Sequence, residues 1–98
     1  MFEVRSSEAF SKWYDSLRDR NARARIQARI DRLELGNPGD MKPVGEGVSE
    51  MRIDYGPGYR VYFMHRDRQV VLLLGGGTKQ SQRRDIAQAI ALARYERS

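Results

Sequence analysis

The sequence predicts an α+β fold in which the elements follow the order β-α-α-β-β-β-α. Two observations lead to this prediction. Apolar side chains recur every three to four positions between residues 10 and 33 and again between residues 86 and 93, which is the spacing of amphipathic helices. Between residues 48 and 74 they alternate with polar residues and then form a continuous run, which is the pattern of strands.

The N-terminal third of the chain is expected to contain one strand and two helices. Residues 1–5 alternate apolar and charged side chains, as a short strand does, and Ser6 or Ser7 can cap the helix that follows. Residues 19–21 interrupt the helical pattern, and the Gly-Asn-Pro-Gly sequence at residues 36–39 ends it. Two helices joined by so short a turn form a helical hairpin. Their apolar faces consist of Phe10, Trp13, Tyr14 and Leu17 in the first helix and of Ala22, Ile26, Ile30 and Leu33 in the second.

The second half of the chain is expected to contain three strands and a helix. Residues 48–55 alternate, residues 56–58 (Gly-Pro-Gly) form a turn, and residues 59–65 form the next strand. Residues 70–74 are continuously apolar, which indicates a central strand buried on both faces. The three glycines at residues 75–77 allow a bend or the close approach of another segment. The last helix, which Ser81 can cap, carries Ile86, Ala89, Ile90 and Ala93.

The length of 98 residues suits one domain, and we expect residues 1–98 to form a single one. The hydrophobic fraction of 40% and the nine aromatic residues are sufficient for a modest core. The absence of cysteine, of an apolar stretch of membrane-spanning length and of a signal-like apolar start predicts a cytoplasmic protein. No cluster of histidine or carboxylate residues suggests a metal site, and the glycines lack Walker spacing, so we expect no metal or cofactor.

The excess of positive charge is the first indication of function. Lysine and arginine number 18 against 13 acidic residues, 15 of the basic residues are arginine, and the pI is close to 10.0. An arginine guanidinium pairs with two phosphate oxygens at once and stacks on bases. This balance favours an anionic partner, either a nucleic acid or an acidic protein, and charge alone does not separate the two.

The turn at residues 56–58 allows a prediction of strand register. A three-residue connection would place Asp54 opposite Arg60 and Arg52 opposite Tyr62. Side chains alternate across a sheet, so one face would be apolar and the other polar, and a slip of one residue would exchange them. The apolar face would hold Met51, Ile53, Tyr55, Tyr59, Val61 and Phe63, and the polar face Glu50, Arg52, Asp54, Arg60, Tyr62 and Met64.

A simple register of the following turn would extend this polar face. Val71 and Leu73 would lie beside it, and the same alternation would place Lys79 on that side. These side chains suit metal-free cleavage of RNA, in which a 2′-hydroxyl attacks the adjacent phosphate and fixed cations stabilise the charge on its oxygens. A tyrosine can stack on a base or move a proton. The candidate catalytic residues are therefore Arg60, Arg52, Lys79 and Tyr62, although a solvated surface can have the same composition.

Five segments carry a resemblance to a known family: FSKW at residues 10–13, VSEMRI at 48–53, YRVYF at 59–63, LLLGGGTK at 72–79 and DIAQAI at 85–90. In their order and spacing the chain resembles toxins of the RelE/ParE superfamily, especially the HigB-like addiction module killer proteins of type II toxin-antitoxin systems. The resemblance covers essentially the whole chain. It implies a RelE-like fold with a curved antiparallel sheet packed against the N-terminal helical hairpin. It also implies cleavage of mRNA in the ribosomal decoding site and a tight complex with a cognate antitoxin from the adjacent gene.

The resemblance also implies roles for single positions. Arg60 matches a strand arginine that contacts the scissile phosphate, Arg52 matches a basic residue on the preceding strand, and Lys79 stands where members carry a basic group after the last strand. Some relatives use a C-terminal tyrosine or histidine for proton transfer. The last helix here offers only Tyr95 and no histidine, so the groups that transfer protons stay open.

Other polar residues are candidates for contact with RNA. The arginines of the second predicted helix can bind ribosomal RNA phosphates, bind acidic residues of an antitoxin, or simply form a solvated face. His65 falls by alternation on the apolar side of its strand and Trp13 belongs to an apolar helix face, so we expect both to be structural. The candidate RNA-binding residues are Arg23, Arg25, Arg29, Asp54 and Gln80.

Three functions are compatible with these patterns. The favoured one is a ribosome-dependent mRNA endoribonuclease (mRNA interferase) that inhibits translation and growth. The alternative is a ParE-like DNA gyrase inhibitor that acts by protein binding without catalysis, and a third is an inactive module that only sequesters its antitoxin. The predicted surface with Arg52, Arg60, Tyr62 and Lys79 favours the nuclease, because a gyrase inhibitor has no need of a phosphate site.

Overall fold

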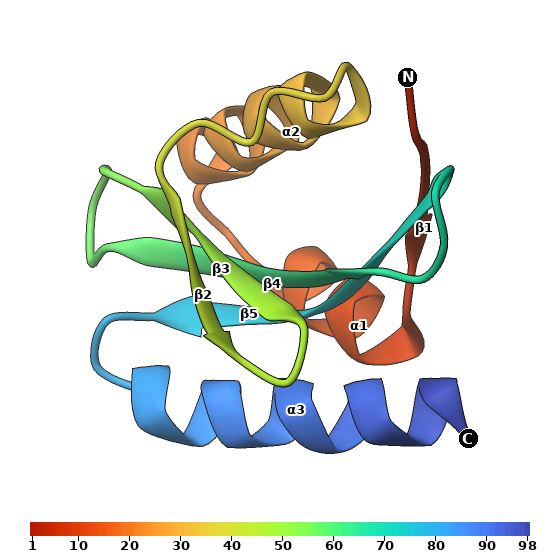
Figure 1. The fold of residues 1–98 in the computed structure, drawn as a ribbon. Coiled ribbons are helices and arrows are strands. Elements are labelled where there is room, and N and C mark those ends of the chain that lie inside the picture. Colours follow the sequence, from red (N-terminus) through yellow and green to blue (C-terminus); the bar gives the residue numbers. More distant parts are fainter.

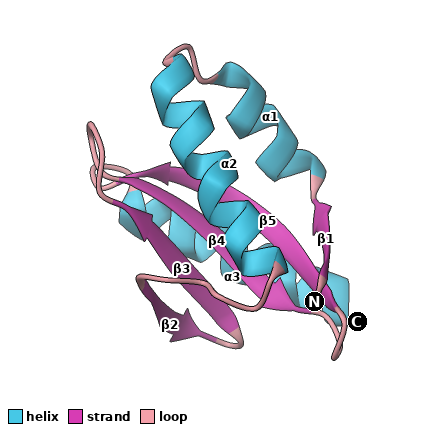
Figure 2. Ribbon diagram, turned by 90° about the horizontal axis from the view of Figure 1, so that it is seen from above, coloured by secondary structure: helices cyan, strands magenta, loops and turns pink.

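The computed structural model describes all 98 residues, which form three helices and one five-stranded sheet. The elements are β1 (Glu3–Ser6), α1 (Glu8–Ser16), α2 (Arg20–Glu34), β2 (Met41–Gly45), β3 (Val48–Ile53), β4 (Tyr59–His65), β5 (Val70–Thr78) and α3 (Gln82–Arg97). The strands lie in the order β1-β5-β4-β3-β2. Helices α1 and α2 lie on one face of the sheet, and α3 runs across the other (Figure 1, Figure 2).

The predicted α+β class is confirmed, with two corrections to the sheet. The sequence analysis does not reveal β2, which pairs with β3 at the edge of the sheet and contains Pro43. Proline donates no ladder hydrogen bond and is typical of edge strands, and so short a segment shows no clear alternation. The second correction concerns β1, which pairs with β5 in parallel, so the sheet is mixed rather than antiparallel. The element order is therefore β-α-α-β-β-β-β-α.

A polar side chain caps the N-terminus of each of the first two helices. Ser7 Oγ accepts a hydrogen bond from the amide of Phe10 at 3.1 Å, which starts α1. Asp19 accepts hydrogen bonds from the amides of Asn21 and Ala22 and starts α2. The predicted break between the helices exists, but it lies at residues 17–19 and not at residues 19–21. Helix α2 ends before Gly36, whose φ of 90° is a conformation that glycine adopts without strain.

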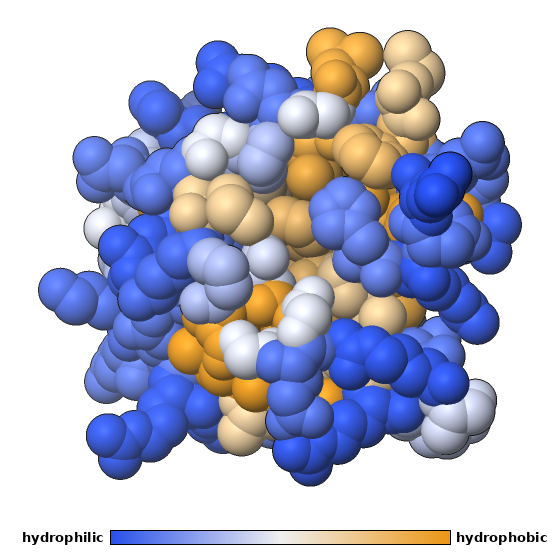
Figure 3. Space-filling view, in the orientation of Figure 1, coloured by the Kyte–Doolittle hydropathy of each residue, from blue (hydrophilic) through white to orange (hydrophobic).

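Two hydrophobic cores lie on opposite faces of the sheet, one beneath α1 and α2 and the other beneath α3. Hydrophilic residues form most of the rim of the face drawn in Figure 3, and hydrophobic ones are visible near its middle. No helix combines the length and the apolar character that crossing a membrane requires. The apolar faces predicted for the second and third helices are buried at Ala22, Ile26, Ile30, Leu33, Ala89 and Ala93.

The β3–β4 hairpin has a longer connection than the sequence suggests. Arg52 lies opposite Arg60 and Glu50 opposite Tyr62, so the pairing is shifted by two residues and residues 54–58 form the turn. Side-chain direction repeats every two residues, so the shift leaves the composition of both faces as predicted.

The β4–β5 turn overturns the predicted position of Val71 and Leu73. It pairs Val71 with His65 and Leu73 with Phe63, so both residues belong to the core beneath α1 and α2 and do not lie on the polar face. Leu73 lies opposite Phe63, but the next pair joins Gly75 to Tyr62, which leaves one extra residue in β5. This bulge follows Val71 and Leu73, so it changes the alternation only of the residues after them.

Beyond the bulge, side chains of β5 that would have pointed to one face of the sheet point to the other. Two glycines in this part of the strand lie in close contact with the helices, one on each face. A methyl group at Gly76 would overlap the indole of Trp13 in α1, and one at Gly77 would overlap the carboxylate of Asp85 in α3. The prediction that the glycine run permits a close approach is confirmed. The reversal also places Lys79 beside the β3–β4 turn, although the alternation used to predict this position is wrong.

Candidate functional site

A shallow hollow at the turn end of the β3–β4 hairpin brings together three of the four predicted catalytic residues. Its volume is about 270 Å³, and Arg52, Arg60 and Lys79 line it. A larger hollow of about 540 Å³ lies between α1 and α3 and contains none of the predicted catalytic residues. We therefore take the smaller one, which we name the cation hollow, as the candidate site. The other residues of its wall are Asp40, Ile53, Asp54, Gly58 and Tyr59.

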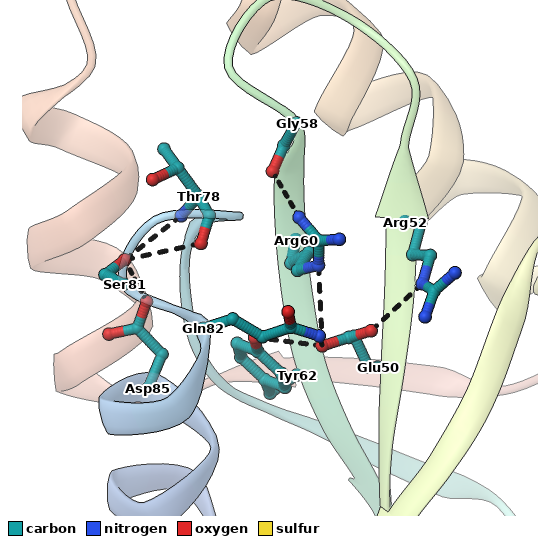
Figure 4. Close-up of polar contacts among 9 residues, drawn as sticks. All are labelled: Glu50, Arg52, Gly58, Arg60, Tyr62, Thr78, Ser81, Gln82 and Asp85. Carbon is teal, nitrogen blue, oxygen red and sulfur yellow. Dashed lines mark hydrogen bonds and ion pairs between the residues drawn. The ribbon is translucent and has the colours of Figure 1, made fainter.

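Arg60, in β4, is only 8% exposed. Its Nη1 donates to the carbonyl oxygen of Gly58 at 2.9 Å (Figure 4). Its Nε lies 3.6 Å from Oε2 of Glu50, too far for a hydrogen bond, and has no other partner. A buried donor without a partner is rare in folded proteins. The hydrogen bond to Gly58 and the charge of Glu50 hold this guanidinium in place. Its Nη2 group makes no hydrogen bond within the protein and is available to a ligand in the hollow.

Glu50, in β3, lies at the centre of the polar contacts behind the hollow (Figure 4). Its side chain is 0% exposed. One oxygen accepts a hydrogen bond from Arg52 Nε at 3.1 Å, and the other accepts from the Tyr62 hydroxyl at 3.1 Å and the Gln82 side-chain amide at 2.8 Å. Burial alone would raise the pKa of this carboxyl group. The three hydrogen bonds and the nearby charge of Arg60 outweigh burial, so the pKa of Glu50 lies below its ordinary value.

Sequence reasoning places Glu50 on the polar face but does not select it as a site residue. The alternation of β3 puts its side chain on the same face as Arg52. What the alternation does not show is that α3 covers this part of the face, with Gln82 in its first turn touching the carboxylate. A glutamate that shares a strand face with two arginines is the signal that could have identified it.

Tyr62 is completely buried, with its ring in the core beneath α3. Burial and the negative charge of Glu50 raise the pKa of Tyr62 well above its ordinary value, so the hydroxyl stays a protonated donor. The sequence predicts an open polar face at this position. Helix α3 instead covers the part that holds Tyr62 and Glu50 and leaves the part with Arg52 and Asp54 open.

Arg52 and Lys79 form the accessible side of the cation hollow. The Arg52 side chain is 39% exposed, and because only its Nε binds Glu50, its Nη groups are available to a ligand. Lys79 is exposed in the turn between β5 and α3. Asp54 is exposed in the hairpin turn and also borders a neighbouring hollow of about 240 Å³, which is lined by arginines of α2, among them Arg25.

Arg29 differs from the RNA contact that the sequence predicts. Its guanidinium donates to the carbonyl oxygens of Pro38 at 2.9 Å, Asp40 at 3.2 Å and Arg52. Burial lowers the pKa of Arg29. The side chain thus fastens α2 to β3 and fixes the backbone of Arg52 beside the hollow, which leaves it little capacity for RNA.

The other candidate RNA-binding residues are distributed around the site. The guanidinium of Arg25 lies 4.6 Å from the ring centroid of Tyr55, next to the cation hollow, and that of Arg23 lies 5.1 Å from the ring of Tyr14, toward α1. Gln80 is exposed beside Lys79 and lines a hollow of about 520 Å³ at the start of α3, which contains no hydrophobic residue. Arg25 and Gln80 therefore extend the polar surface of the site.

His65, which the sequence analysis expects to be structural, and Tyr95, the tyrosine of the last helix, both lie away from the hollow. His65 is exposed at the far end of β4, where its ring packs 5.1 Å from Phe2 and 6.1 Å from Phe63 in edge-to-face contacts. Tyr95 is exposed near the C-terminal end of α3, whereas the hollow adjoins the N-terminal end of that helix. Neither ring is placed to reach a ligand bound between Arg52 and Arg60.

The arrangement can bind a phosphate-sized anion and stabilise charge that develops on it. Arg60 is held by buried contacts, and Arg52 and Lys79 offer further cations from two other segments. Asp40 and Asp54 add carboxylates that can accept a hydrogen bond or a proton. No group of three or more histidine, cysteine, aspartate or glutamate side chains is placed to hold a metal ion.

Comparisons with known proteins extend this description. Residues 12–97 match the family of phage-derived Gp49-like proteins (DUF891). An uncharacterized protein of Haemophilus influenzae is 45% identical over 91 residues, which are 93% of this chain and 92% of that protein. No solved structure matches the chain.

Proposed function

The chain belongs to the phage-derived Gp49-like family, a family of RelE/HigB-like toxins, and we propose that it is a ribosome-dependent mRNA endoribonuclease. In this proposal residues 1–98 form one toxin domain that acts in the cytoplasm and inhibits translation. The observation that supports the activity is the cation hollow, in which the Nη2 group of Arg60 makes no hydrogen bond within the protein and lies beside Arg52 and Lys79. A protein that inhibits gyrase by binding alone has no need of such a site.

The proposed reaction is an internal transfer of the phosphoryl group. The 2′-hydroxyl of the RNA attacks the adjacent phosphorus, loses its proton to a base, and forms a 2′,3′-cyclic phosphate. The bond from phosphorus to the 5′-oxygen breaks, and that oxygen takes up a proton and leaves as a 5′-hydroxyl. Arg60 binds the non-bridging oxygens, whose charge grows in the transition state, and Arg52 and Lys79 add positive charge around them.

In this proposal the side chains that transfer protons are those that line the hollow. Asp54 and Asp40 are the carboxylates in its wall, and either can take the proton of the 2′-hydroxyl. Lys79 is the exposed ammonium that can give a proton to the leaving oxygen. Tyr62 acts from behind, by holding Glu50, and does not touch the RNA. Arg25 and Gln80 bind the phosphates or bases on either side of the cleaved bond.

The proposal includes two macromolecular partners besides mRNA. The ribosome presents the substrate, and the net charge of +5 favours contact with ribosomal RNA. A cognate antitoxin from the adjacent gene neutralises the toxin, and acidic residues on it would complement the same surface. Expression of the chain alone is expected to stop growth, and co-expression of the neighbouring small gene to restore it.

Two parallel reactions test the proposed activity. Purified protein is added to programmed ribosomes, where the ends of the cut mRNA are identified, and to a gyrase supercoiling reaction. We expect a cut with a 2′,3′-cyclic phosphate or 3′-phosphate and unchanged supercoiling. Primary cuts with 3′-hydroxyl ends would exclude the mechanism. Intact mRNA together with blocked supercoiling would identify the protein as the ParE-like alternative.

A further inference from the structure

The buried carboxylate of Glu50 touches no reacting atom in the reaction described above, yet it joins three elements of the fold at the site. It lies on β3 and contacts Arg60 and Tyr62 on β4 and Gln82 on α3. We propose that Glu50 is a positioning residue, whose negative charge holds Arg60 and Arg52 in the orientation that the phosphate requires. This inference rests on the proposed function, because it concerns the same hollow.

The surroundings of Glu50 argue against a purely structural reason for a carboxylate there. Beneath α3 the same sheet face is apolar, and an apolar side chain in place of Glu50 could join that core. Burying a charge costs free energy that an ion pair offsets only with good geometry, so buried pairs are weak evidence for stability. The two arginines that Glu50 faces both extend to the cation hollow. The charge is therefore placed where it acts on ligand-binding groups.

The contacts of Glu50 constrain the two arginines in different ways. Arg52 is bound through Nε at 3.1 Å, which leaves both Nη groups on the side of the hollow. Arg60 is bound through Nη1 to Gly58, and its Nε faces Glu50 at 3.6 Å. A guanidinium held at one edge has few orientations left for its other donors, so less entropy is lost when a phosphate binds.

Glu50 cannot itself be the base in this geometry. Its side chain is 0% exposed, and it does not line the hollow. Its effect on a substrate must therefore pass through Arg52 and Arg60, and this distinguishes a positioning residue from a catalytic one.

The first measurement is single-turnover cleavage on programmed ribosomes with Glu50→Gln, which keeps the shape of the side chain and removes its charge. We expect the rate at saturating ribosomes to fall on the order of 10- to 100-fold, the loss typical of misplaced catalytic groups, with little change in the half-saturating concentration. Glu50→Asp should recover part of the rate. The matched control is Glu46→Gln, because Glu46 is an exposed glutamate that pairs with Arg94 away from the hollow.

A double variant tests whether Glu50 acts through Arg60. Effects that pass through a common group are not additive. In the background of Arg60→Ala, the further change Glu50→Gln should therefore lower the rate by no more than about threefold, through the remaining effect on Arg52. A second full loss of 10- to 100-fold would show that Glu50 acts independently of Arg60 and would overturn the inference.

A third measurement needs no cleavage at all. Side-chain NMR follows the Nε–H groups of Arg52 and Arg60, which should be ordered in the wild type and in Glu46→Gln. In Glu50→Gln they should become mobile while the amide spectrum still shows a folded protein. Unchanged Nε–H signals would overturn the inference, even if the rate falls. If Glu50→Gln does not fold, the same comparison is made with Glu50→Asp, where a shifted carboxylate should loosen both arginines.

These readouts separate the inference from the function on which it rests. A wild-type protein that leaves mRNA intact refutes the nuclease proposal, while the NMR comparison still decides whether Glu50 orders the arginines. A wild-type protein that cleaves normally, with Glu50→Gln equally fast and equally ordered, refutes the inference alone.

Discussion

Replacing Arg60 with alanine tests the site most directly, because this side chain lines the hollow and is also buried. The change removes the hydrogen bond to Gly58 and the 3.6 Å ion pair with Glu50. Breaking a buried ion pair costs about 3–5 kcal/mol when the partner is left uncompensated. Glu50 keeps three hydrogen bonds, so we expect a smaller loss of about 1–2 kcal/mol. This corresponds to a fall in Tm of roughly 4–16 °C for a chain of this length.

The effect of Arg60→Ala on cleavage should be much larger than its effect on stability. Loss of one oriented donor to a charged transition state costs about 2.7–4 kcal/mol, or on the order of a hundred- to a thousand-fold in rate. Arg60→Lys restores the charge but not the two-pronged contact, so it should recover only part of the rate. The measurement is single-turnover cleavage on programmed ribosomes at 25 °C, with a thermal melt of each variant and an assay of antitoxin binding.

The comparison of these three measurements decides the outcome. Antitoxin binding should change less than cleavage, because a protein interface spreads over many residues. Near-normal cleavage by folded Arg60→Ala would refute the assignment of Arg60 to the active site and would favour the gyrase inhibitor.

Further predictions concern packing, the histidine and the dependence on pH. Gly76→Ala should lower the free energy of unfolding by about 1–3 kcal/mol in a denaturant melt, because the added methyl group overlaps the indole of α1. Gly75→Ala is the matched control, since no atom outside the two adjacent residues lies within 4 Å of the added methyl group, and equal losses in the two variants would contradict the packing argument. His65→Gln should keep most cleavage activity, since the ring lies at the far end of β4, and a loss of several orders of magnitude in a folded variant would show that the site is misplaced. Folding lowers the pKa of Glu50, so its contribution to stability is present above the pKa of the unfolded chain and is lost as pH falls through the folded value. The Tm of the wild type should therefore fall as pH drops below about 4.3, with a smaller fall in Glu50→Gln, and parallel curves would exclude this contribution.

Periodicity along the chain is sufficient to predict a large part of this protein. The spacing of Ala22, Ile26, Ile30 and Leu33 identifies the buried face of α2, because helical residues three and four apart share a face wherever the helix is placed. The two faces of the β3–β4 hairpin are also predictable, even though the register is shifted by two residues, since side-chain direction has a period of two. The arginine-rich composition likewise indicates an anionic partner without any knowledge of the fold.

Only the tertiary structure decides which polar residues meet and which remain open to solvent. The bulge in β5 reverses the alternation after Leu73, and a single extra residue leaves no mark in a run of apolar and glycine residues. Helix α3 begins about 30 residues after Glu50 and covers it, so no local pattern in β3 can show that this carboxylate is buried. The guanidinium of Arg29 likewise donates its hydrogen bonds to carbonyl groups of a loop and of β3, which are distant in sequence. These contacts join segments that are distant in sequence, and their geometry depends on how whole elements pack against one another. The spacing of apolar residues within one element does not determine that packing.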